Sequence, residues 1–144
     1  HITKINNMFQ CTTKVRVRYA ETDQMGYCYY GNYAQYYEVA RVEGLRKLGI
    51  IYKDLETQGY LLPVSDFKIK YILPAFYDEE LLVKCIINEL PKVKIKFKYE
   101  IHNTNGDLLN FGSTTLVFVD RKTKKPVNCP NFLINELLKF IHEE

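Results

Sequence analysis

The sequence has 144 residues, the length of one typical domain, and this is enough to bury a hydrophobic core without disulfide or metal support. Hydrophobic residues make up 47% and charged residues 26% of the chain, which is typical of a globular protein rather than a disordered one. The net charge of +3 is too small to indicate nucleic-acid binding, and no apolar run approaches the roughly 18–20 residues of a membrane span. No basic and apolar leader opens the sequence, so we expect a cytoplasmic protein.

The composition also excludes several kinds of catalytic site. Neither serine lies in a G-x-S-x-G motif, and the four cysteines form no C-x-x-C pair. No phosphate-binding glycine motif is present. We therefore expect neither a metal nor an organic cofactor, which leaves carboxylates and backbone groups for catalysis. Half of the twelve tyrosines cluster between Tyr27 and Tyr37.

The first predicted elements are a strand and a loop. Residues 1–10 show no clear pattern, and we expect a frayed end there. From Cys11 to Tyr19, apolar and basic residues alternate with a period of two, which predicts a half-buried strand. Residues 21–26 break this alternation and indicate a loop.

The clearest element of the sequence is a helix that begins near Asn32, a residue type that caps helices, and stops before Gly49. The small residues Ala40 and Gly44 lie one turn apart on it and indicate close packing against another element, such as a curved sheet. A short helix is predicted over residues 51–57. The apolar and small positions with helical spacing are Tyr33, Tyr36, Tyr37, Ala40, Gly44, Leu45 and Leu48.

The rest of the chain predicts an antiparallel sheet and a last helix. Asn105-Gly106 is a strong hairpin signal, and residues 130–143 have the pattern of an amphipathic helix. One long helix followed by hairpin-connected strands indicates a single α+β domain over residues 1–144. The predicted strands follow apolar alternation around Phe67–Tyr71, Leu81–Leu90, Val93–Ile101 and Leu108–Val119.

Two blocks of the sequence resemble the hotdog-fold acyl-CoA thioesterases of the 4-hydroxybenzoyl-CoA thioesterase type. The first runs from Val17 to Tyr33 and includes Asp23, a Gly three residues later, an aromatic pair and the helix start. The second comprises Pro63-Val64 and Tyr71–Leu81. The resemblance covers about Cys11 to Val119 and implies a curved antiparallel sheet wrapped around one long helix. It further implies an acyl-CoA substrate and a homodimer or dimer-built homotetramer with active sites between subunits.

The same resemblance implies two catalytic groups. Asp23 occupies the position of the family's aspartate, which acts either as a nucleophile on the thioester carbonyl or as a general base on water. The backbone N–H of Tyr30, or that of Gly31, would bind the carbonyl oxygen as it becomes negative. The first N–H groups of a helix have no partner within it, and one well-aimed donor contributes about 3–4 kcal/mol. Some relatives carry His at the position of Tyr30, so only its amide is assigned a role.

The expected substrate contacts are Met25, Tyr29, Gly31, Tyr33 and Ser65. The bulky residues among them hint at a restricted or aromatic-lined pocket, and Ser65 lies where relatives often place a small polar residue near the thioester. Other roles stay open for individual residues. On residue type alone Asp23 would be a turn-capping loop residue, and Ser65 would have no part in the pocket. Cys28 is a rival nucleophile, although a packing role fits it better because no histidine lies near it in sequence.

The alternating lysines of the strands have three interpretations. They form the solvated side of a half-covered sheet, attract the phosphates of coenzyme A, or bind single-stranded nucleic acid, which is the weakest of the three because the tyrosines cluster elsewhere. The alternatives to an acyl-CoA thioesterase are a non-catalytic module that senses acyl thioesters and a hotdog hydratase or dehydratase. Acyl-carrier protein in place of coenzyme A also stays open. The lysines are Lys68, Lys70, Lys92, Lys94, Lys96 and Lys98.

Overall fold

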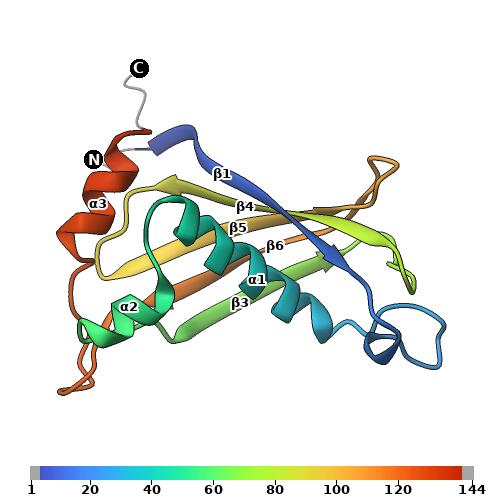
Figure 1. Cartoon of the computed structure of the whole chain (residues 1–144), viewed down its shortest axis with the longest axis horizontal. Helices are drawn as coiled ribbons and strands as arrows, with labels where there is room; N and C mark the ends of the chain where they lie inside the picture. The colour runs from blue at the N-terminus through green and yellow to red at the C-terminus, as the bar shows by residue number, and fades with distance from the viewer. Residues whose placement is uncertain (1–3, 141–144) are drawn as a thin grey trace.

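The computed structural model describes residues 4–140 and shows one long helix lying against a curved antiparallel sheet (Figure 1). The helix is α1 (Asn32–Lys47). The five-stranded sheet has the order β1-β4-β5-β6-β3. The predicted α+β class and hotdog arrangement are confirmed. The strands of this sheet are β1 (Lys4–Arg16), β3 (Val64–Tyr71), β4 (Glu80–Glu89), β5 (Lys94–His102) and β6 (Leu108–Val117).

Smaller elements lie toward one end of the sheet (Figure 1). The short helix α2 (Tyr52–Thr57) follows α1, as predicted. Next to it β2 (Tyr60–Leu61) pairs with β7 (Val119–Asp120) in a separate two-stranded sheet. The final helix α3 (Asn131–Leu138) buries Leu133 and Leu137.

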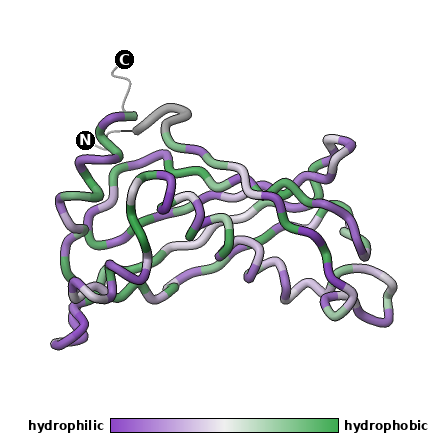
Figure 2. The backbone as a smooth tube through the Cα atoms, in the orientation of Figure 1, coloured by the Kyte–Doolittle hydropathy of each residue, from purple (hydrophilic) through white to green (hydrophobic). Residues whose placement is uncertain are grey.

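The alternating sequence of β5 accounts for the two different faces of the sheet. Ile95, Phe97, Tyr99 and Ile101 are buried on the side that α1 covers. The lysines between them are exposed on the opposite face, and in Figure 2 the strands change colour from residue to residue. A period of two places successive side chains on opposite faces, so one strand serves both core and surface.

The core is centred on the contact between α1 and the sheet. Every position predicted from the helical spacing of α1 is buried. The Tyr37 ring stacks on Tyr99 of β5 at 4.2 Å between ring centroids, and its hydroxyl donates to Asn110 Oδ1 at 2.6 Å. Gly112 of β6 makes room for this ring, because a Cβ there would lie 3.1 Å from Tyr37 Cε2.

Three predicted boundaries were wrong. The strand β1 begins at Lys4 rather than Cys11, so the expected frayed end is paired with β4 from Lys4 onward; backbone pairing through a bulge needs no side-chain alternation. It ends at Arg16 rather than Tyr19, because residues Tyr19–Glu21 form a 3-10 turn. The last helix ends at Leu138. Residues 1–3 and 141–143 of these predictions lie outside the described residues.

The two edges of the sheet differ in chemistry. Along β1 the exposed residues beyond Phe9 are polar or charged: Gln10, Thr12, Lys14 and Arg16. The opposite edge strand β3 instead exposes Val64, Phe67 and Tyr71, whose exposed fractions are 49%, 41% and 48%. Asp66, Lys68 and Lys70 are exposed on β3 as well, so this edge mixes charged and large apolar residues, whereas the exposed residues of β1 beyond Phe9 are all polar. Exposed apolar residues leave an edge strand less protected against pairing, so β3 is the less protected edge.

Candidate active site

The loop between β1 and α1 folds into a small hairpin that holds Asp23 at its turn. Thr22 and Cys28 form an antiparallel bridge, and the Asp23 N–H donates to the Tyr27 carbonyl oxygen at 3.1 Å. The Gly26 N–H returns to the Asp23 carbonyl at 3.0 Å, and Gly26 has φ +86°, a conformation that favours glycine. The sequence Asp-x-x-Gly thus has a local structural reason in addition to any catalytic one.

The carboxylate of Asp23 is only partly engaged by the protein. Its Oδ1 accepts a hydrogen bond from the Met25 N–H at 2.8 Å, and the side chain is half-buried at the rim of a cavity. Its charge reaches the neighbouring aromatic ring: the pKa of the Tyr29 hydroxyl is raised, chiefly by the adjacent Tyr30 and in smaller part by Asp23. Asp23 therefore has the turn-capping contact expected for its residue type and also faces the cavity.

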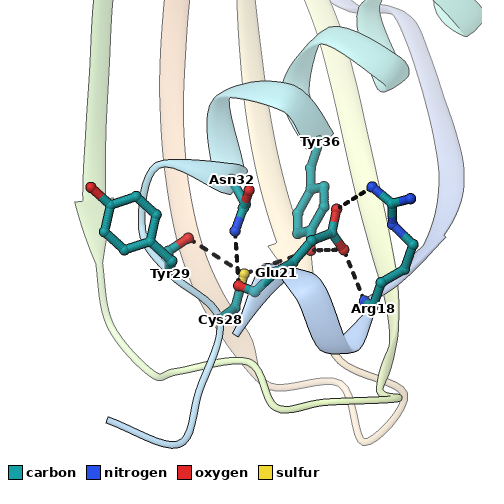
Figure 3. A network of polar contacts seen from close by, with 6 residues as sticks. All are labelled: Arg18, Glu21, Cys28, Tyr29, Asn32 and Tyr36. Carbon is teal, nitrogen blue, oxygen red and sulfur yellow. Dashed lines mark hydrogen bonds and ion pairs between the residues drawn. The ribbon is translucent and has the colours of Figure 1, made fainter. Parts of the chain in front are cut away.

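The start of α1 leaves two backbone donors unused. The N-cap residue is Gly31, which has no side chain to accept a hydrogen bond from the first turn. The Asn32 N–H donates to the Tyr29 carbonyl oxygen, and the Tyr33 N–H donates to the Tyr30 carbonyl oxygen. Within residues 4–140, no acceptor lies within hydrogen-bond reach of the Tyr30 and Gly31 N–H groups. Asn32, predicted as the cap, instead donates through Nδ2 to the Glu21 carbonyl at 2.8 Å (Figure 3). The positive end of the helix dipole lies at these free donors.

A cavity of about 440 Å³ lies beside Asp23 and the helix start. Tyrosine rings form much of its wall: Tyr71 lies 6.2 Å from Tyr30 and 5.9 Å from Tyr33, measured between ring centroids. The lining residues are Asp23, Met25, Tyr27, Cys28, Tyr29, Tyr30, Tyr33, Tyr71, Ile72, Leu73 and Pro74.

The structure brings most of the predicted site residues together. Gly31 is adjacent rather than lining, and the Tyr29 ring covers it so closely that a Cβ would be 2.7 Å from Tyr29 Cε2. Ser65 is not at this cavity; it is exposed near the start of β3, and its hydroxyl donates to the Thr115 carbonyl at 3.1 Å. Its predicted part in the pocket is not supported within one chain, because β3 carries it away from the end where Tyr71 lies. The wall formed by residues 71–74 was not predicted, although the second resembling block contains it.

Cys28 is unsuited to the role of a nucleophile. It is buried, and burial raises the pKa of its thiol, which disfavours the reactive thiolate. Within residues 4–140, its sulfur contacts the Tyr36 hydroxyl at 3.6 Å and no histidine. His102, the one histidine in the described part of the chain, lies on β5 with Glu100 as its charged neighbour. The packing role of Cys28 is the better interpretation.

Two features are absent from residues 4–140. No group of three or more His, Cys, Asp or Glu side chains is arranged to hold a metal ion. None of the described helices has the length and apolar character needed to cross a bilayer. On the outer sheet face, Lys68, Lys70, Lys96 and Lys98 surround a shallow hollow of about 420 Å³ floored by β6, separate from the Asp23 cavity.

Comparison with known proteins now decides the family. The family model described as "Thioesterase superfamily" matches residues 25–110, a range that begins two residues after Asp23. The chain belongs to the thioesterase superfamily. The predicted hotdog fold and thioesterase class are confirmed.

Relatives of this thioesterase include proteins of known structure. This chain is 38% identical over 114 residues to the putative acyl-CoA thioesterase YneP of Bacillus subtilis, and the alignment covers 79% of this chain and 83% of YneP. It is 32% identical to the acyl-CoA thioesterase YbgC of Haemophilus influenzae, covering 81% and 85%. The crystal structure of DHNA-CoA thioesterase from Staphylococcus aureus superposes with a TM-score of 0.81 at 41% identity, covering 84% of this chain and 81% of that one.

Proposed function

We propose that this acyl-CoA thioesterase hydrolyses its substrate with the Asp23 carboxylate and the free backbone donors of Tyr30 and Gly31. One observation carries the proposal: Asp23 and Tyr30 line the same cavity, and the Tyr30 and Gly31 N–H groups have no acceptor among residues 4–140. Thioester hydrolysis needs these two functions, an activated oxygen and a donor for the developing oxyanion. No metal or organic cofactor is part of the proposed mechanism.

The proposed reaction proceeds by addition and elimination at the thioester carbonyl. Either Asp23 takes a proton from a water molecule that attacks the carbonyl carbon, or its carboxylate attacks directly and forms a mixed anhydride that water then cleaves. In both cases the carbonyl oxygen becomes negative, and the helix-start N–H groups donate to it. The tetrahedral intermediate collapses by breaking the carbon–sulfur bond, and the coenzyme A thiolate takes up a proton. The water route leaves the free acid directly, whereas the nucleophilic route leaves the mixed anhydride, which water cleaves to the free acid and the Asp23 carboxylate.

The test of Asp23 is its replacement by asparagine. Asp23→Asn keeps the Oδ1 acceptor for the Met25 N–H, so the chain folds, but it removes the base or nucleophile. We expect kcat/KM to fall by about 10³-fold or more, measured as thiol release over acyl-CoAs of varied chain length, aryl examples included. Asp54→Asn on the exposed side of α2 is the matched control and should retain wild-type turnover.

Two results would contradict this proposal. Near-normal turnover by Asp23→Asn would exclude the carboxylate from the chemistry. Binding of acyl-CoA by the wild type in calorimetry without any thiol release would identify the sensor module instead. Repeating the screen with acyl-carrier protein thioesters separates the two carriers. The predicted cytoplasmic location is tested by cell fractionation.

The proposed active form contains at least two copies of the chain. The cavity is bordered by Tyr71, Ile72 and Leu73, all of them about half exposed, at the end of the less protected edge strand β3. A second copy placed along this edge would cover the apolar residues and close the cavity. The homodimer, and a homotetramer built from it, are therefore proposed to form through β3.

A further inference from the structure

The residues that hold the Asp23 hairpin against the start of α1 converge on Glu21, through both its buried carboxylate and its backbone carbonyl (Figure 3). Only 7% of Glu21 is exposed, although hydropathy would place a loop glutamate in solvent. A buried carboxylate is costly unless hydrogen bonds satisfy its oxygens. The hydrogen bonds to Glu21 therefore indicate which parts of the site this residue connects.

The Glu21 side chain is bonded from two elements. Its Oε1 accepts hydrogen bonds from the Arg18 N–H at 2.8 Å and from the Tyr36 hydroxyl at 2.9 Å, and its Oε2 accepts one from Arg18 Nη2 at 3.3 Å. Tyr36 is itself buried in the second turn of α1. The carboxylate thus ties the 3-10 turn before Asp23 to the body of the helix.

The backbone carbonyl of Glu21 accepts hydrogen bonds from the segment that carries the free Tyr30 and Gly31 N–H groups. The Glu21 carbonyl oxygen accepts the Tyr29 N–H at 2.8 Å and Asn32 Nδ2 at 2.8 Å. These two residues flank Tyr30 and Gly31. Asp23, meanwhile, lies two residues after Glu21 in the bridged hairpin. Glu21 is therefore hydrogen-bonded to the segment that carries the free donors and lies two residues before Asp23 in the chain, while it touches neither reacting group.

We propose that Glu21, together with Tyr36, is a positioning residue that fixes the Asp23 carboxylate relative to the Tyr30 and Gly31 N–H groups. The inference rests on the proposed function. Catalysis by two groups on different segments depends on their separation, and a misplacement of about 1 Å can lower the rate about 10²-fold. An ionised carboxylate makes stronger hydrogen bonds than a neutral amide, so its charge determines how rigid the junction is.

The variants Glu21→Gln and Tyr36→Phe test this. Each keeps the size of the side chain and weakens the bond between Glu21 and α1. We expect kcat to fall about 10-fold or more in both, with KM within about twofold of the wild type, because positioning affects the reacting geometry more than substrate binding. Circular dichroism and thermal melts establish that the measured samples are folded.

Matched controls lie elsewhere in the chain. Glu136→Gln removes a glutamate that is ion-paired to Lys139 at 3.0 Å on α3. Tyr52→Phe removes a tyrosine hydroxyl that donates to the Leu62 carbonyl at 3.1 Å. Both should leave kcat unchanged. Equal losses of kcat in these controls would overturn the proposal.

The outcomes separate this inference from the function on which it rests. If folded Glu21→Gln and Tyr36→Phe lose thermal stability but keep wild-type kcat, Glu21 is structural only and the inference is wrong. If Glu21→Gln does not fold, Tyr36→Phe decides by the same criterion. Asp23→Asn is measured in parallel: its inactivity beside a normal Glu21→Gln refutes only the positioning role, whereas full activity of Asp23→Asn refutes the proposed function itself.

Discussion

At the scale of single residues, two carboxylates two positions apart have opposite surroundings. Glu21 is buried, and both of its carboxylate oxygens accept hydrogen bonds. Asp23 is half-buried and accepts the Met25 N–H on one carboxylate oxygen, and the group lines the cavity. Full satisfaction makes a carboxylate a structural anchor, and partial satisfaction leaves lone pairs for a substrate or water. The two acidic residues of one loop therefore have different roles.

The pH dependence of stability should report the Glu21 anchor. Burial raises the pKa of its carboxyl, but hydrogen bonds from Arg18 and Tyr36 outweigh burial, so the pKa is lowered in the folded chain. A group with a lowered folded-state pKa stabilises the fold fully above its unfolded pKa, about 4.3 for Glu, and less as the pH falls through the folded value. We expect the wild type to exceed Glu21→Gln by about 1–3 kcal/mol in free energy of unfolding at pH 7.

Urea denaturation at pH 7, 5.5 and 4 measures that difference. It should be similar at pH 7 and pH 5.5 and should shrink below about pH 4.5. A difference that is the same at pH 7 and pH 4 would show that the charge of Glu21 does not stabilise the fold.

At the scale of elements, α1 links the core to the active site. Its first residues provide the free donors, Tyr36 in its second turn bonds Glu21, and Tyr37 beside it stacks on Tyr99 of β5. Consecutive residues on one helix thus connect the catalytic loop and the centre of the sheet. Substitutions that alter the packing of α1 against the sheet should therefore change the free energy of unfolding.

Two glycines at the contact between α1 and the sheet, Gly44 on α1 and Gly112 on β6, predict opposite effects of one methyl group. At Gly44, a Cβ would make ordinary contacts, the nearest being Phe9 Cε1 at 3.5 Å, so Gly44→Ala should stabilise by about 0.5–1 kcal/mol through helix propensity. At Gly112, a Cβ would overlap the Lys68 carbonyl oxygen, and backbone cannot move aside cheaply. Gly112→Ala should destabilise by about 1–3 kcal/mol. Urea denaturation of both variants checks the pair, and shifts of the same sign would contradict this packing.

Local patterns predicted the elements better than they predicted the site. The alternation in β5 and the helical spacing in α1 predicted which side chains are buried, because each period is a property of its own element. Burial of Glu21 depends on Tyr36, fifteen residues later, and no local pattern encodes that contact. The same is true of Arg41, which is buried on α1 with its Nη1 donating to the Tyr99 hydroxyl at 3.2 Å. Ser65 was placed by resemblance alone, and the strand that carries it leads away from the cavity.

At the scale of the whole molecule, the chain presents one protected edge and one less protected edge. Beyond Phe9 the exposed residues of β1 are all polar or charged, whereas β3 exposes large apolar side chains beside its charged ones, and Tyr71 among them lines the cavity. An exposed apolar edge strand pairs readily with a second chain. The mass of one chain is 17.0 kDa, so light scattering distinguishes a monomer from the proposed dimer or tetramer directly.

The substitution Phe67→Lys tests whether the β3 edge is the interface. Phe67 lies mid-strand and is 41% exposed, and in a symmetric dimer the substitution would place a charge on both copies. We expect the wild type to be a dimer or tetramer by light scattering, and Phe67→Lys to be a folded monomer whose turnover is lowered at least about 10-fold because the cavity stays open. Thr12→Lys on the β1 edge is the control and should keep the assembly and the turnover. A wild type that is monomeric and fully active at micromolar concentration would show that each chain carries a complete site.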